Sequence, residues 1–331
     1  MPSLHHIRAD KPPTYPDQAV YAEFAARSFG LAFNPLDNGS GLAFGVASKT
    51  RQIVFGGGRA SYYPQNNATA ATLAADKYLS AVVLTNAGIP TMGGQYFFLS
   101  ERYRAHRADG HERNDAIAHF HSIGGHAFVK PLAGSRGDFA QAVHDEDALR
   151  RYLDDVARYY DAIIMQNIVE GDEYRVFVMD DCVLYSTRKY PPYVIGDGVS
   201  SRHTLLTARN ADFLAYGLSN AVATGDLNAV PAEGERWSLP GRMNRSAGGE
   251  MIFDEPPKGV SAMAIAAVRA LGLRVGGVDV FTGVKDELST RVIEINANPS
   301  IRFLEDSDRD DLILAIWRHT FTAMGLLDVQ R

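Results

Sequence analysis

Residues 291–299 constrain the fold of this 331-residue chain more than any other segment. Polar and apolar residues alternate there, so a β-strand would place Glu294 and Asn296 on one face and two isoleucines on the other. Residues 277–281 have the pattern of a preceding strand and are the natural hairpin partner, which would bring Asp279 to the same face. We therefore predict a hairpin with a row of oxygen-bearing side chains on one side.

The residue types in this row indicate a metal site. Asp279, Glu294 and Asn296 offer carboxylate and amide oxygens, and no thiolate or imidazole stands among them. Mg²⁺ prefers such ligands and usually completes its octahedron with water and substrate phosphate, and Mn²⁺ is the alternative ion. The other interpretation is a row of polar residues at a sheet edge, but apolar neighbours would then bury unpaired charge. We therefore predict Mg²⁺ together with a nucleotide.

The composition is that of a folded globular protein. Hydrophobic residues make up 46% of the chain and charged residues 22%, which argues against disorder and coiled coil. The 33 basic and 39 acidic side chains give a net charge of −6, so we expect no basic face for nucleic acid. The single cysteine, Cys182, excludes an intramolecular disulfide and favours a reducing compartment.

Two segments bear on membrane association, and neither predicts it. Residues 1–13 carry histidines and charged residues without an apolar core, so we see no secretory signal there. The uncharged stretch between Lys77 and Glu101 is interrupted by glycines and a proline, which is typical of helix, turn and strand rather than a membrane span. We expect a cytoplasmic protein with no membrane partner.

Periodicity and turn residues divide the chain into three predicted units. Residues 1–75 form a small N-terminal unit, and Asp76, which can cap a helix, begins a second unit of residues 76–162. Residues 163–331 form the third unit. The patterns predict an α/β (α+β) chain with helices within 17–29, 68–87, 145–160, 261–271 and 311–324, and strands within 31–33, 42–46, 52–55, 126–132, 163–169, 174–179, 183–188, 278–281 and 291–296.

Two further segments have the composition of ligand-binding loops. Residues 128–137 form a strand that delivers Lys130 and then a loop of small residues with Gly134 and Ser135, a pattern suited to backbone contacts with phosphate. This loop is neither a Walker loop nor a dinucleotide fingerprint, and taken alone it is equally well explained as a structural turn. Residues 165–175 pass from strand to strand through a glycine, and such a crossing can offer backbone groups to a purine and a carboxylate to a ribose.

The order and spacing of these segments resemble the ATP-grasp carboxylate-amine ligases, in particular the cyanophycin synthetase and glutathione-ligase branch. The resemblance covers roughly residues 70–325 and implies the ATP-grasp fold, in which two α+β units grip ATP. Residues 76–162 would be the central lid subdomain with the phosphate loop, and residues 163–331 the C-terminal subdomain with the metal site. The resemblance to the family rests on residues 76–77, 130–131, 171–175, 277–279 and 294–296. The resemblance to the branch rests on residues 188–198 and 244–249.

By this resemblance, the nucleotide site draws on all of these segments. Lys77 and Lys130 would contact the ATP phosphates, and Glu173 would bind the ribose. Gly134 and Ser135 would form the flexible phosphate loop. The adenine site would be formed by Gln166, Asn167, Ile168 and Val169. Relatives often have glutamate in place of Gln166, and Gly-Val or Gly-Leu where residues 139–140 are Phe-Ala, so the path of the phosphate loop stays open.

The resemblance also implies catalytic roles. Asp279, Glu294 and Asn296 would hold the magnesium ions, Arg188 would neutralise charge on the transferred phosphoryl group or acyl phosphate, and Asn244 would lie near the phosphates and metal. Arg302 follows the metal strand and is a candidate partner for a substrate carboxylate, with a surface arginine as the alternative. Tyr190 is a candidate for lining the substrate pocket or, equally, for bracing the loop that follows it.

The activity implied by the resemblance is ATP-dependent amide bond formation. The carboxylate of an amino acid or small peptide would be activated as an acyl phosphate and captured by an amine, with release of ADP and phosphate. A small-molecule kinase or a thiol ligase would share the ATP site, and a nucleotide-binding regulatory module without catalysis is a third alternative. Small-molecule substrates are the expected partners, and homo-oligomerisation stays open.

Overall fold

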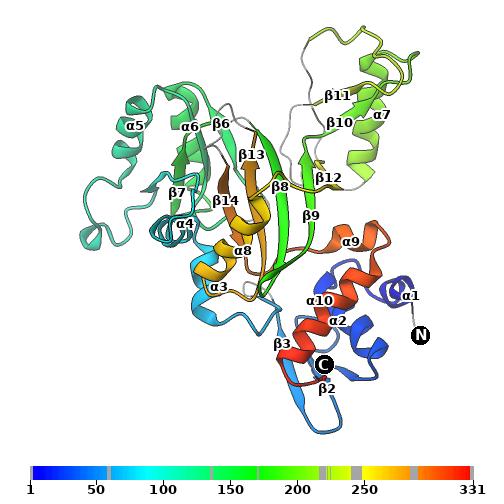
Figure 1. Cartoon of the computed structure of the whole chain (residues 1–331). Helices are drawn as coiled ribbons and strands as arrows, with labels where there is room; N and C mark the ends of the chain where they lie inside the picture. The colour runs from blue at the N-terminus through cyan, green and yellow to red at the C-terminus, as the bar shows by residue number, and fades with distance from the viewer. Residues whose placement is uncertain are drawn as a thin grey trace.

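The computed structural model describes residues 3–57, 61–134, 137–169, 171–215, 221, 223, 225–239, 248–283 and 290–328 (Figure 1). Antiparallel strand pairs build sheets of three, two, five and four strands in this part of the chain. The five-stranded sheet, in the order β12-β9-β8-β13-β14, is called the central sheet below. None of the helices described here has both the length and the apolar character needed to cross a bilayer.

The two ends of the chain share one hydrophobic core. Helix α2 and the three-stranded sheet pack with α10, and Trp317 of α10 lies with its ring centroid 6.0 Å from that of Phe55 in β3. Residues 1–75 therefore have no separate core, although they form the predicted elements. The elements of this region are α1 (Leu4–Ala9), α2 (Asp17–Ser28), β1 (Ala32–Pro35), β2 (Ala43–Ala47), β3 (Gln52–Gly56), α9 (Arg302–Asp306) and α10 (Asp310–Ala323).

Two short helices, α3 (Ala68–Ala75) and α4 (Lys77–Asn86), lead from this core toward the sheets. Asp76 caps α4 as predicted, because its carboxylate accepts hydrogen bonds from the backbone N–H groups of Tyr78 and Leu79 at 2.9 Å each. The cap starts a new helix directly after α3, so Lys77 is the first residue of α4.

The four-stranded sheet, in the order β4-β7-β5-β6, carries Lys130 on β5. A core that includes Phe97, Phe120 and Leu153 joins one of its faces to α5 and α6. Helix α5 was not predicted, and a capping box between Glu112 and Asp115 begins it. The elements are β4 (Gln95–Phe98), η1 (Arg104–His106), α5 (Arg113–Ser122), β5 (Ala127–Pro131), β6 (Gln141–Val143), α6 (Glu146–Val156) and β7 (Ala162–Gln166).

The central sheet has one apolar and one partly polar face. Helix α8 (Val260–Ala270) covers the apolar face through a core that includes Val176, Val278 and Val280 (Figure 1). The predicted pairing is confirmed, because Asp279 pairs with Glu294 and Gly277 pairs with Asn296. The predicted alternation is wrong at Ile293, because a register shift after Asp279 places Val292 rather than Ile293 in the core with Ile295. The strands are β8 (Asp172–Met179), β9 (Cys182–Tyr190), β12 (Glu250–Phe253), β13 (Val275–Thr282) and β14 (Arg291–Asn296).

A small unit projects beyond β9 in Figure 1. It contains β10 (Tyr193–Ile195), β11 (Arg236–Ser238) and α7 (Arg202–Ala215), none of which the sequence patterns predicted. Aromatic and arginine side chains hold its base, where the Arg236 guanidinium lies 3.9 Å from the Tyr193 ring centroid and 4.6 Å from that of Tyr190. Tyr190 therefore contacts the base of this unit through Arg236.

Candidate nucleotide and metal site

The polar face of the central sheet collects side chains of opposite charge. The strand register places Glu173 opposite Lys189, Arg175 opposite Asp279, and Asp279 opposite Glu294. Residues paired across neighbouring strands point to the same side of a sheet, so these side chains form one row across the strands. Because α8 covers the other face, the row faces away from that helix.

Asp279 is at the centre of this row and is only 2% exposed. Arg175 donates to both of its carboxylate oxygens at 2.7 Å, and the Lys189 ammonium donates to one of them at 2.8 Å. Burial by itself would raise the pKa of Asp279, but the two cations outweigh it and lower the pKa to about 2. The carboxylate is therefore held in its charged form.

Lys189 connects Asp279 to Glu173, whose carboxylate accepts a second hydrogen bond from the same ammonium group. Burial lowers the pKa of Lys189, but the two carboxylates outweigh that effect and the pKa is raised. Burial also raises the pKa of Glu173, against the attraction of Lys189. The residue predicted to bind ribose is thus paired with a buried lysine.

Two further lysines approach the row from other elements. Lys130 on β5 is 6% exposed, and burial lowers its pKa while the negative charge of Glu294 opposes the shift. Lys77 at the start of α4 has its pKa lowered by burial as well, again opposed by Glu294. Its ammonium donates to the backbone carbonyl of Gly134 at 2.5 Å, so it already contacts the predicted phosphate loop.

Between α4, the end of β7 and the middle of β14 the chain forms a small pocket. Lys77, Ser80, Gln166 and Glu294 are among its lining residues. Gln166 is buried and donates from its side-chain amide to the carbonyl of Gly93 at 2.6 Å. The predicted adenine residues that follow it are less covered, with Asn167 exposed and Ile168 and Val169 half-buried.

The chemistry of the predicted metal ligands fits Mg²⁺. Asn296 donates to one oxygen of Glu294 at 3.4 Å, which leaves its own amide oxygen available as a ligand. Asp279 accepts three hydrogen bonds, and a carboxylate offers about four lone-pair sites. The predicted set consists of two carboxylates and one amide. It is therefore not a group of three or more His, Cys, Asp or Glu side chains, and the described residues hold no such group.

Not every predicted site residue lies in this row. Arg188 lies on the opposite face of the central sheet, where it donates to Asp172 at 2.5 Å and stacks on Tyr190. Arg302 contacts Asp17 at 3.2 Å and Asp306 at 3.0 Å, so acidic side chains already surround it. Ser135 and Asn244 lie outside the described residues.

Lys189 and Arg175 are the members of the row to which the sequence analysis gave no role. Alternation along β9 contained the signal for Lys189, because two consecutive strand residues point to opposite faces. Pairing Lys189 rather than Arg188 with Glu173 needed the register between β8 and β9. For Arg175 the signal was its place two residues after Glu173, on the same face of the same strand.

No family model matches the sequence. It is 25% identical over 252 residues to the glutathione biosynthesis bifunctional protein GshAB of Desulfotalea psychrophila, and the matched region covers 68% of this chain and 31% of that protein. It is 28% identical over 262 residues to the cyanophycin synthetase of Synechocystis sp., which covers 70% of this chain and 28% of that protein. A crystal structure of a bifunctional glutathione synthetase from Pasteurella multocida matches with a TM-score of 0.54 and 20% identity, over 86% of this chain and 40% of that chain.

These similarities confirm the predicted fold and the predicted relationship. The chain has the α+β ATP-grasp fold and is related to the ATP-grasp regions of GshAB and cyanophycin synthetase. It spans about a third of the length of these two relatives. The similarity therefore concerns a shared region and not the complete relatives.

Proposed function

We propose that this protein is an ATP-dependent carboxylate-amine ligase that joins amino acids or small peptides. The observation that carries the proposal is that Lys77 and Glu294 line one pocket and that the buried Lys130 lies within the field of Glu294 and Asp279, within an ATP-grasp fold. Cations from one sheet and its neighbouring helix face anions from another, which suits a metal-nucleotide complex bound between them. The relationship to GshAB and cyanophycin synthetase supports the same class of chemistry.

Each part of ATP has proposed contacts. Lys77 and Lys130 contact the phosphates, and Lys77 exchanges the Gly134 carbonyl for a phosphate oxygen when ATP binds. Asp279, Glu294 and Asn296 hold Mg²⁺, which neutralises phosphate charge when bound. Glu173 binds the ribose, and Gly134 and Ser135 belong to the loop over the phosphates. The adenine base is bound by Gln166, Asn167, Ile168 and Val169.

The proposed reaction has two steps. A substrate carboxylate oxygen attacks the γ-phosphorus of ATP, the bond to the bridging oxygen breaks, and ADP leaves. The amine nitrogen of the second substrate then attacks the carbonyl carbon of the acyl phosphate, phosphate leaves, and the amine proton passes to phosphate or water. Positioning and electrostatic stabilisation are sufficient for such a transfer, so no nucleophilic side chain is needed.

Lys189 is the proposed group that stabilises negative charge on the transferred phosphoryl group. It lies in the row with Asp279, whereas Arg188 lies on the other face of the sheet. Its ammonium is buried, and a fixed cation in a buried site is worth more than one in water. Asn244 keeps its proposed place near the phosphates, and Arg302 and Tyr190 keep only a proposed role in binding substrate.

The test is phosphate release with Mg²⁺-ATP across a panel of amino acids and dipeptides, with mass spectrometry of the products. We expect an amide product in equal amounts with ADP and phosphate, and its loss in Glu294→Ala. A phosphorylated product that keeps the phosphate would identify a kinase, and a thioester would identify a thiol ligase. Nucleotide binding without turnover of any mixture would favour a regulatory module.

A further inference from the structure

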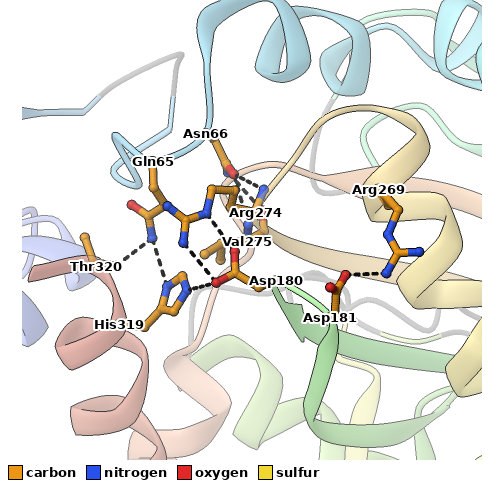
Figure 2. Close-up of polar contacts among 9 residues, drawn as sticks. All are labelled: Gln65, Asn66, Asp180, Asp181, Arg269, Arg274, Val275, His319 and Thr320. Carbon is orange, nitrogen blue, oxygen red and sulfur yellow. Dashed lines mark hydrogen bonds and ion pairs between the residues drawn. The ribbon is translucent and has the colours of Figure 1, made fainter. Parts of the chain in front are cut away.

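Two adjacent buried amides, Gln65 and Asn66, stand just before α3 (Figure 2). They are 9% and 7% exposed. The Asn66 amide oxygen accepts from the backbone N–H groups of Arg274 and Val275 at 2.8 and 3.0 Å. Its nitrogen donates to the carbonyls of Val275 and Ala297 at 2.8 and 3.0 Å. One side chain thus uses its donors and acceptor on the backbone of two strand ends.

These contacts lie at the open end of the hairpin that carries the predicted metal ligands. Val275 is the first residue of β13, and Ala297 directly follows Asn296, the last residue of β14. The last rung of the ladder joins Gly277 to Asn296, so the Asn66 side chain adds the next connection between the two strands. Ser61 strengthens it, because its hydroxyl also donates to the Ala297 carbonyl, at 2.6 Å.

The connection matters because β14 is the edge strand of the central sheet. An edge strand has a full ladder on one side only, so contacts at its ends contribute more to its register and order. On its other side β14 has an isolated bridge, from Val292 to Thr91. Without the Asn66 amide, the end of β14 that holds Asn296 would lose its side-chain connection to the first residue of β13, and the Ser61 hydroxyl would still donate to the Ala297 carbonyl.

We propose that Asn66 is a positioning residue that fixes Glu294 and Asn296 relative to Asp279, and thereby sets the affinity of the metal site. The metal part of this inference rests on the proposed function, whereas the ordering of β14 does not. Asn66 belongs to the N-terminal segment outside the ATP-grasp resemblance. That segment would thus contribute to the metal site without touching the metal.

Gln65 provides a matched control within the same turn. Its side-chain nitrogen donates to the Thr320 hydroxyl at 2.9 Å and lies 3.4 Å from Nδ1 of His319, both on α10 (Figure 2). It is a buried amide like Asn66, but its recorded contacts go to α10 and not to β13 or β14. Gln65→Ala and Asn66→Ala therefore remove similar buried amides from the same turn. The first removes a contact to α10, and the second removes contacts to the ends of β13 and β14.

The experiment measures hydrogen-deuterium exchange of peptides covering residues 291–298 in the protein without ligand. In parallel, Mn²⁺ binding is measured by electron paramagnetic resonance in the presence of ADP. The Asn66 amide donates to the carbonyls of Val275 and Ala297, so its loss should let this end of the hairpin open more often. We expect roughly tenfold faster exchange and roughly tenfold weaker Mn²⁺ binding in Asn66→Ala than in Gln65→Ala.

Equal exchange of residues 291–298 in the two variants, or equal Mn²⁺ affinity, would overturn the inference. If Asn66→Ala does not fold, Ser61→Ala replaces it. This change keeps the Asn66 amide and removes the second hydrogen bond to Ala297 together with the one that the Ser61 hydroxyl accepts from the Tyr63 N–H, so a smaller change in the same direction is expected. Absence of Mn²⁺ binding in the unmodified protein would instead contradict the proposed metal site. The exchange measurement would then still decide whether Asn66 orders β14.

Discussion

Arg188 and Lys189 are consecutive residues of β9, and their side chains lie on opposite faces of the central sheet. Lys189 joins the buried row with Glu173 and Asp279, whereas Arg188 pairs with Asp172 beside the Tyr190 ring. The difference follows from the two-residue period of a strand. The side chain that faces Asp279 is therefore the better candidate for contact with the reacting groups.

Replacing each of the two residues by methionine separates their roles. We expect Lys189→Met to lower kcat by about 100-fold or more, as the loss of a buried charge-stabilising group does in other enzymes. Arg188→Met should change kcat by less than about threefold, because it leaves the row intact. The measurement is amide product formed per unit time at saturating substrates. A larger loss in Arg188→Met would contradict the assignment of Lys189.

Asp279 has a structural role in addition to its proposed role at the metal. In Asp279→Ala, Arg175 and Lys189 would lose the carboxylate they share while staying buried. Leaving buried cations without their partner typically costs about 3 to 5 kcal/mol of unfolding free energy. Glu294→Gln is the comparison. It can keep the long hydrogen bond with Asn296 but removes a charge that offsets the burial of Lys77 and Lys130, so we expect a smaller loss there than in Asp279→Ala. Urea unfolding of both variants tests this difference.

Lys130 should reduce stability in the absence of nucleotide. Burial lowers its pKa, so the unfolded chain binds this proton more tightly than the folded protein does. The penalty is therefore fully present below the lowered pKa and disappears as the pH rises toward the ordinary pKa of lysine. We expect Lys130→Met to raise Tm by about 2 °C at pH 7 without ligand and to weaken Mg²⁺-ADP binding. A lower Tm of the variant without ligand would contradict this.

Asp180, in the turn between β8 and β9, accepts hydrogen bonds from Arg274 and is within hydrogen-bond distance of His319 (Figure 2). Hydrogen bonds from Arg274 and then His319 lower its pKa to about 2. Its contribution is present above the ordinary pKa of aspartate and is lost as the pH falls through about 2. Because the group is half-exposed and screened, we expect Asp180→Asn to cost at most about 1 kcal/mol at pH 7, a difference that shrinks between pH 5 and pH 3.

Asp181→Asn is the control for this measurement, because the Asp181 pair with Arg269 is exposed on both sides. Its effect on the unfolding free energy should stay below about 0.5 kcal/mol at both pH values. Urea unfolding at pH 7, 5 and 3 compares the two variants. If the loss of unfolding free energy in Asp180→Asn grew toward low pH, the charge of the Asp180 carboxylate would not be the source of the stabilisation.

Much of the local structure was determined by the sequence alone. The alternating residues 291–296 predicted β14 and its partner strand, and Asp76 predicted the start of α4, because both signals act within a few residues of the chain. The unpredicted helix α5 begins with three polar or charged residues and has a weak apolar pattern, so the local signal was poor. The strands β10, β11 and β12 were missed because each has only three or four residues, and helix α7 was missed as well.

The tertiary structure decided which of the polar residues lie together. Lys130 is 149 residues before Asp279 in the sequence, and Asn66 is 231 residues before Ala297, so neither proximity is encoded in a local pattern. Alternation separated Arg188 from Lys189, but only the register with β8 and the packing of α8 on the opposite face decided which side is polar. The physical reason is that alternation along a strand separates two faces but does not determine which face is buried. Distant parts of the chain determine this when they pack against one of the faces.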